Sequence, residues 1–150
     1  MAAMQAPPQV DARTLDDYLE VMTRAVFQSG ISWKVVEAKW AGIRTALHEF
    51  DVERLAHLSP SDVDALMEDE RIIRHRGKLD AIVHNADRML AIEDEEGFRS
   101  YLRGQGDFWA TSRRLRKDFK YLGEMGAYYF LYVVREPVPP HDEWRARTAK

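Results

Sequence analysis

Two basic clusters hold side chains that can bind an anionic polymer. The first spans residues 71–78 and has four lysines or arginines, and the second spans residues 113–120 and has five against the single acid Asp118. Lysine and arginine in such numbers favour phosphate binding, although a charge run is also typical of a solvated helix face. Composition alone leaves both interpretations open.

The second cluster has a context typical of a DNA-binding hairpin. A six-residue connection, 118–123, closes on Gly123 and is followed by an apolar segment from Met125 to about Val134. Glycine lets backbone N–H groups approach a phosphate oxygen, and the next helix presents the positive end of its dipole there. The pattern predicts a helix-hairpin-helix at about residues 111–134. The alternative is a plain helical corner with Phe119 and Tyr121 packed underneath.

A second informative segment lies between two expected helices. Gln28, Gly30 and Ile31 stand just ahead of Trp33. An apolar side chain at a helix junction can wedge into a base stack, and a nearby aromatic face can hold an unstacked base. The alternative is that Ile31 and Trp33 belong to the core.

The segments that position these side chains are predicted to be helices. Side chains that can accept a free backbone N–H precede the apolar stretches: Thr14, Ser32, Ser59, and Thr111 with Ser112. Pro60 follows Ser59 at the first helical position, where proline is favoured. A longer helix is expected from about Arg76 to an acidic break at 93–96. Since no segment alternates convincingly over more than four residues, the sequence predicts an all-α fold.

Length and composition bound the remaining possibilities. The chain has 150 residues, a net charge of −3 and no cysteine. We expect a disordered leader at 1–12, a helical domain at 13–136 and a proline-rich tail at 137–150. The missing cysteines exclude thiolate nucleophiles and iron–sulfur clusters, and the net charge argues against coating nucleic acid by bulk electrostatics. We expect a cytoplasmic monomer without membrane contact, metal or cofactor.

Several motifs together form a family pattern. They are Gln28-x-Gly30-Ile31-Ser32-Trp33, Phe50-Asp51, Ile72 to Lys78 followed by Ile82 and Asn85-Ala86, and Phe119 to Gly123. Over about residues 14–134 the chain resembles the DNA-3-methyladenine glycosylase I family of the helix-hairpin-helix superfamily. The resemblance implies a helix-hairpin-helix glycosylase-like helical bundle. It also implies an enzyme that bends double-stranded DNA, extrudes a damaged purine and hydrolyses the N-glycosidic bond.

The resemblance also implies roles for individual residues. Trp33 and Ala25 would line the site of the extruded base, and Gln28, Gly30 and Ile31 would fill the gap left in the duplex. The residues expected to contact the DNA backbone are Phe119, Lys120, Tyr121, Leu122, Gly123, Arg76 and Lys78.

The chain departs from the family at its active site. The family's active-site glutamate falls on Ala25, so we expect an altered choice of lesion, and the family's zinc site is lost with its cysteines. In the superfamily, an aspartate about twenty residues beyond the hairpin glycine supplies a catalytic negative charge. Asp142 and Glu143 lie 19 and 20 residues after Gly123, which makes them catalytic candidates. The alternative is that they belong to an exposed polar tail.

Two functions therefore stay open. One is a repair glycosylase for an alkylated or otherwise damaged purine, and the other is a catalytically inactive helix-hairpin-helix module that only binds DNA. An open cavity beside Trp33 and Ala25 with a carboxylate pointing into it would favour catalysis. A cavity filled by Phe27, Met22 or Tyr18 would favour binding alone.

Overall fold

The computed structural model describes residues 6–149, and within this part of the chain every regular element is helical. The elements are α1 (Leu15–Gln28), α2 (Trp33–Ala46), the 3₁₀ turn η1 (His48–Phe50), α3 (Val52–Ala56), α4 (Pro60–Met67), α5 (Arg76–Glu96), α6 (Phe98–Arg103), α7 (Phe108–Asp118), α8 (Glu124–Val133) and α9 (His141–Thr148). The all-α prediction is confirmed. No helix in this range is long and apolar enough to cross a membrane.

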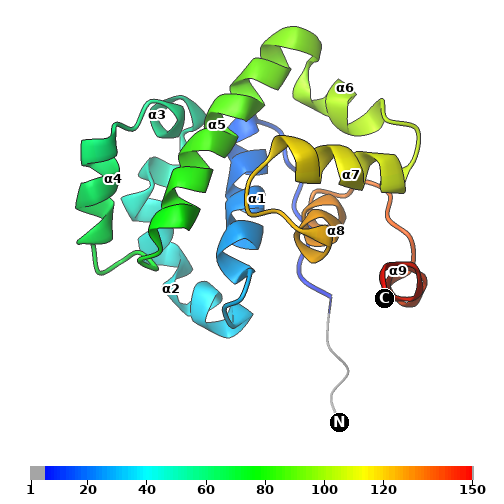
Figure 1. The fold of residues 1–150 in the computed structure, drawn as a ribbon, viewed down its shortest axis with the longest axis horizontal. Helices are drawn as coiled ribbons and strands as arrows, with labels where there is room; N and C mark the ends of the chain where they lie inside the picture. Colours follow the sequence, from blue (N-terminus) through cyan, green and yellow to red (C-terminus); the bar gives the residue numbers. More distant parts are fainter. Residues whose placement is uncertain (1–5, 150) are drawn as a thin grey trace.

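Helices α1 and α5 form the centre of the molecule. Helices α2, α3 and α4 lie on one side of them, and α6 to α9 lie on the other (Figure 1). The apolar face of α1 is fully buried at Leu19, Met22 and Val26, where it meets the main core. Because α1 contacts both α5 and α8, it lies where the two halves of the fold meet.

Two predicted helix starts are confirmed in detail. The Asp17 N–H donates to Thr14 Oγ1 at 3.3 Å, and the Thr14 N–H donates back to the Asp17 carboxylate at 3.2 Å. The same reciprocal pair joins Ser59 and Asp62, with Pro60 as the first helical residue. Local hydrogen bonding therefore fixes these two boundaries.

Two other predicted boundaries were wrong. Helix α5 runs through the acidic run to Glu96 and ends at Gly97, whose φ of +82° suits glycine. Helix α7 begins at Phe108 rather than at 111–112, because the Asp107 carboxylate accepts the Ala110 N–H at 2.8 Å and caps the helix one turn earlier.

The N-terminal segment runs along α8. The Val10 N–H donates to the Val133 carbonyl at 2.8 Å, and the Gln9 side chain donates to the Tyr132 carbonyl at 2.8 Å. Ala12 is buried. Of the leader expected to be disordered, residues 1–5 lie outside the described residues, whereas residues 9–12 are held by these contacts.

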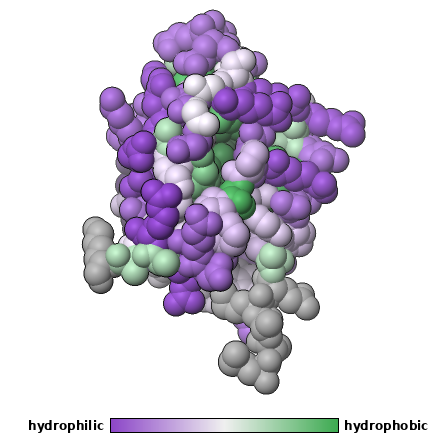
Figure 2. Space-filling model, turned by 90° about the vertical axis from the view of Figure 1, so that its right-hand side faces the viewer, coloured by the Kyte–Doolittle hydropathy of each residue, from purple (hydrophilic) through white to green (hydrophobic). Residues whose placement is uncertain are grey.

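The proline-rich tail expected at 137–150 contains helix α9. Trp144 is only 5% exposed and its ring lies 4.9 Å from that of Tyr128. The Arg147 guanidinium lies 3.9 Å from the centre of the Trp109 ring. These aromatic contacts hold the tail on the domain. Seen from the side that carries α9, the surface is largely hydrophilic and its apolar residues gather near the centre (Figure 2).

Candidate functional site

A cavity of about 860 Å³ opens where α1, the start of α2, the α7–α8 loop and α8 meet. The N-terminal segment from Ala6 to Asp11 forms part of its wall. A second cavity, near Phe108 and Pro137, measures about 190 Å³. A concave site of the larger size is typical of ligand binding.

Exposed apolar side chains concentrate at the larger cavity. Five large apolar side chains are exposed among the described residues, and four of them line it: Val10, Trp33, Tyr121 and Met125. Keeping such surface in water is unfavourable, so its concentration at one place is typical of a surface that binds a partner or ligand.

The two residues expected to receive the base both line this cavity. Trp33 is the first residue of α2 and is 55% exposed, whereas Ala25 on α1 is only 4% exposed and lies deeper. The side chains considered as fillers, Phe27, Met22 and Tyr18, are instead buried in the core. The space beside Trp33 and Ala25 is therefore open.

The loop expected to act as a wedge adjoins the same cavity. Gln28 lines the cavity at the end of α1, and Gly30 adopts a φ of +75°, a conformation that favours glycine. Ile31 is half-buried and packs against the core, so only part of its side chain is free to enter a duplex.

Lys78, expected to contact the DNA backbone, holds this loop from inside the protein. Its side chain is 3% exposed, and its ammonium donates to the Phe27 carbonyl at 3.1 Å and to the Ser29 carbonyl. Burial lowers the pKa of the ammonium. These carbonyls lie at the carboxyl end of α1, where a positive charge also complements the helix dipole. Because its ammonium is occupied in this way, the DNA-backbone role expected for Lys78 is not supported by this geometry.

Arg76 has a different set of partners. Its guanidinium pairs with Asp64 on α4 and, at 3.5 Å, with Asp80 on its own helix. Both contacts raise its pKa, the hydrogen bond to Asp64 most. Since two carboxylates already neutralise this cation, Arg76 is less suited to a phosphate than the sequence suggested.

The hairpin between α7 and α8 divides into buried and exposed residues. Phe119 and Leu122 are buried, so their side chains anchor the loop and do not reach a ligand. Lys120, Tyr121 and Gly123 are exposed. The alternative in which both aromatic residues pack underneath holds for Phe119 but not for Tyr121.

Helix α5 holds the hairpin in place. The Asn85 amide donates to the Lys120 carbonyl at 3.1 Å, and its oxygen accepts the Lys120 N–H at 2.8 Å. The His75 ring lies edge-on to the Tyr121 ring at 5.6 Å. A Cβ on Gly77 would come within 2.7 Å of the Tyr121 hydroxyl, so the glycine allows a close approach. The residues 75–85 therefore position the hairpin.

The basic cluster on α7 is partly neutralised. Arg114 pairs with Asp118 at 2.9 Å, and Arg116 pairs with Glu124 at 3.5 Å. Within residues 6–149, the exposed cations of this cluster that make no ion pair are Arg113, Lys117 and Lys120. Unpaired positive charge therefore remains around the hairpin.

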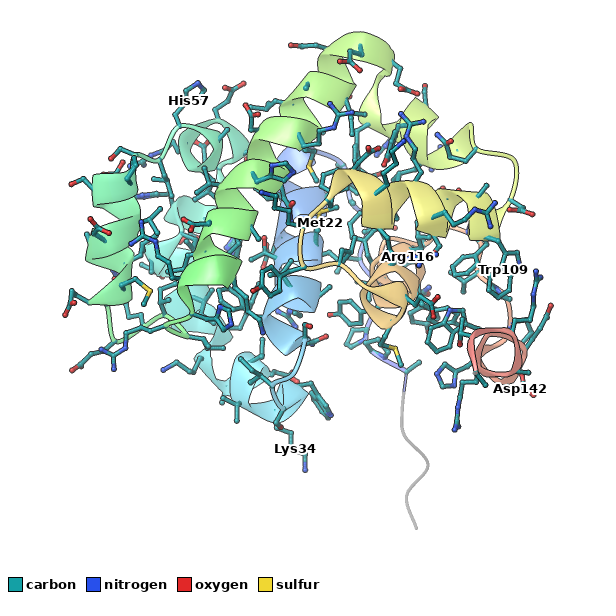
Figure 3. All side chains as sticks on the ribbon, viewed as in Figure 1. Met22, Lys34, His57, Trp109, Arg116 and Asp142 are labelled. Atoms are coloured by element: carbon teal, nitrogen blue, oxygen red, sulfur yellow. The ribbon has the colours of Figure 1, made fainter. Side chains whose placement is uncertain are left out.

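The catalytic candidates on the tail lie away from the cavity. Asp142 and Glu143 are exposed in the first turn of α9 and are not among the residues that line the cavity. In Figure 3, Asp142 lies far from Lys34, which is next to Trp33. Tyr128 on α8 faces α9, whereas the next residue, Tyr129, lines the cavity. The catalytic role expected for Asp142 and Glu143 therefore does not fit this arrangement.

Among the polar residues that line the cavity and that sequence reasoning missed are Arg24, Glu37 and Tyr129. Burial raises the pKa of the Tyr129 hydroxyl, the neighbouring Arg24 and Gln28 lower it, and the negative charge of Glu37 adds to the rise. Glu37 follows Trp33 by four residues, which places both on one face of α2. This spacing was the signal available in the sequence.

The described residues do not fit a zinc site. In residues 6–149 no group of three or more metal-binding side chains comes together. His141 stacks against Trp144 with ring centres 5.6 Å apart, so it has a packing role.

Comparison with known proteins gives a consistent result. The methyladenine glycosylase family model matches residues 7–127. The DNA-3-methyladenine glycosylase of Haemophilus influenzae is 46% identical over 66 residues, which are 44% of this chain and 36% of that protein. DNA-3-methyladenine glycosylase 1 of Escherichia coli is 37% identical over 86 residues, 57% of this chain and 44% of that protein. The aligned segments thus span less than half of these relatives.

Solved structures extend the similarity to the fold. A 3-methyladenine DNA glycosylase I superposes with a TM-score of 0.71 at 30% identity, covering 86% of this chain and 81% of that one. The Staphylococcus aureus enzyme, solved to explain 3-methyladenine recognition, gives a TM-score of 0.70 at 26% identity, covering 86% and 79%. The glycosylase-like helical bundle is confirmed.

Proposed function

Because the chain belongs to the methyladenine glycosylase family, we propose that it excises a damaged purine from double-stranded DNA. The observation that carries this proposal is the open cavity, which joins the exposed ring of Trp33 to the exposed hairpin of Tyr121 and Gly123. A base cannot be cleaved inside the stack, so an enzyme of this kind needs a cavity for the extruded nucleotide next to a grip on the strand.

Excision of an alkylated purine does not require covalent catalysis by the protein. Alkylation at a ring nitrogen gives the purine a positive charge, which makes it a good leaving group. The protein mainly has to hold the base, reject undamaged bases and tolerate the positive charge that develops on the sugar. Stacking on Trp33 supplies the first of these, because every base has a flat face that an exposed indole can cover.

The hairpin supplies the grip on the strand. Gly123 has an ordinary φ of −90°, and a Cβ there would meet no atom within 4 Å. No contact within residues 6–149 requires glycine at this position, so the open space suits the close approach of a phosphate to the first turn of α8. Arg113, Lys117 and Lys120 add exposed positive charge.

The choice of lesion follows from Ala25. Where the family has a glutamate, this cavity has a methyl group at its buried end. Position 25 thus contributes no carboxylate to the recognition of the base, and we propose that the preferred damaged purine differs from 3-methyladenine or is excised with different selectivity.

Release of free base tests the proposal directly. Purified protein is incubated with methylated DNA and with duplexes that carry single lesions, and the released base is measured. We expect release by the wild-type chain, a severe loss in Trp33→Ala, and weaker duplex binding in Gly123→Ala with unchanged folding stability. Three exposed cations at the hairpin predict a salt slope, log Kd against log salt, of about 3.

The possible outcomes separate the two functions. Duplex binding with this salt dependence but without release of any base would show a DNA-binding module that lacks catalysis. Absence of both release and duplex binding would contradict the proposal altogether.

A further inference from the structure

Glu37 stands apart among the acidic residues of the cavity. The other four carboxylates that line it already have partners within 3.5 Å: Asp11 with Arg135, Asp17 with the backbone N–H groups of Arg13 and Thr14, Glu20 with Trp40 and Arg44, and Glu124 with Arg116. Within residues 6–149 the Glu37 carboxylate makes neither an ion pair nor a hydrogen bond. It is therefore the carboxylate available to a ligand.

Glu37 is also correctly placed relative to the aromatic platform. It lies one helical turn after Trp33 on α2, and both residues line the cavity. Side chains four residues apart on a helix are neighbours on one face. A base stacked on Trp33 thus has the Glu37 carboxylate within reach at its edge.

The opposite wall of the cavity is polar as well. Tyr129 on α8 lines it, and the charge of Glu37 acts on the Tyr129 hydroxyl. The positive charge of Arg24 acts on the same hydroxyl and lowers its pKa, and the Arg24 guanidinium lies 4.5 Å from the centre of the Trp40 ring, on which it packs. A carboxylate and a hydroxyl from different helices thus converge on one space, and the cation beside them is engaged by an aromatic ring.

We propose that Glu37 is the base-recognising carboxylate of this protein and that it contacts the positively charged edge of an N-alkylated purine stacked on Trp33. The inference rests on the proposed function and adds which residue selects the substrate. A cationic base gains a charge-assisted contact with the carboxylate, whereas a neutral, undamaged base only strips water from it. The difference between these two outcomes is the source of selectivity.

The test compares two variants at position 37 with a matched control. Glu37→Gln removes the charge and keeps the shape, Glu37→Asp keeps the charge, and Glu95→Gln removes one exposed negative charge at the far end of α5. The readouts are the single-turnover release of 3-methyladenine and 7-methylguanine from methylated DNA, the Kd for a duplex with a stable abasic-site analogue, and Tm.

We expect Glu37→Gln to release the cationic bases about 10 to 100 times more slowly than wild type, the range for loss of a charge-assisted hydrogen bond. Glu37→Asp should stay within about fivefold of wild type, because the charge is what matters. Affinity for the abasic duplex should change no more in Glu37→Gln than in Glu95→Gln, since that duplex offers no base to the cavity.

Two results overturn the inference while leaving the proposed function intact. One is release by Glu37→Gln within about twofold of a wild-type chain that is active. The other is a loss of release matched by an equal loss of affinity for abasic DNA or by a lower Tm, which would show a structural role. If the wild-type chain itself releases no base, the proposed function fails, and the inference fails with it.

Discussion

Replacing Lys78 by methionine tests whether the motif at residues 71–78 acts inside the protein. Methionine keeps the apolar stem of the side chain and removes the ammonium that donates to the Phe27 and Ser29 carbonyls. A hydrogen bond from a charged group contributes about 1.5 to 3 kcal/mol, so two contribute about 3 to 6 kcal/mol. The variant also escapes the cost of burying an ion, which offsets part of this loss.

The net expectation for Lys78→Met is a loss of about 2 to 4 kcal/mol in the free energy of unfolding. In a chain of this length, 1 kcal/mol corresponds to roughly 2 to 4 °C, so Tm should fall by about 4 to 16 °C. Urea unfolding followed by circular dichroism measures the first quantity. Lys117→Met, at an exposed position of α7, is the matched control and should change stability by no more than about 0.5 kcal/mol.

The same variant carries a pH signature. Because burial lowers the pKa of Lys78 below its ordinary 10.5, the unfolded chain binds more protons at this position between the two pKa values. The contribution of Lys78 to stability therefore rises with pH across that interval. The gap in unfolding free energy between wild type and Lys78→Met should be smallest near neutral pH and should grow toward pH 10.5. A loss below about 1 kcal/mol, or a gap that narrows with pH, would refute the buried role.

Three further predictions concern other parts of the molecule. Trp144→Ala should cost about 3 to 5 kcal/mol of stability in urea unfolding while base release per folded molecule stays unchanged, because α9 does not line the cavity; a drop in release would contradict this. Asp142→Asn should leave base release at the wild-type rate, and a large decrease would restore its catalytic candidacy. The side chain of Arg71 and its backbone N–H together lower the pKa of Asp69 to about 2. In Arg71→Ala, which keeps the backbone N–H, NMR should show an Asp69 pKa above that of the wild type and still below its ordinary 3.8; the small contribution of Asp69 to stability is present above pH 3.8 and is lost as pH falls toward 2.

Local hydrogen-bonding chemistry was readable from the sequence. The starts at Thr14 and Ser59 depend on residues three positions apart, so the whole interaction lies within one turn of helix. The start of α7 was misplaced because two possible N-caps, Asp107 and Thr111, lie four residues apart. Asp107 caps the helix by accepting the Ala110 N–H, so the helix begins before Thr111. A local pattern predicts well only where it has no local competitor.

The burial of the charged Lys78 could not be predicted from the sequence. In the run at 71–78, Arg71 and Arg74 are exposed, as expected for a basic surface segment, yet Lys78 is buried. Its partners, the carbonyls at the end of α1, lie about fifty residues earlier in the chain. The packing of α5 on α1 creates the buried position of Lys78, and the spacing of residues within 71–78 does not predict it.

The position of the negative charge in the cavity also depends on how the helices pack. At its buried end, Ala25 on α1 faces Gly126 on α8, where a Cβ would lie 3.8 Å from the Ala25 methyl group, so this end is small and apolar. Glu37 is exposed and stands nearer the opening, on the same face of α2 as Trp33. On the proposed function, a base that enters the cavity meets the negative charge of Glu37 at the wall on which it stacks, whereas the deepest point limits only its size. The proposal thus places recognition of the base on α2 rather than at Ala25 on α1, where the resemblance places the family's glutamate.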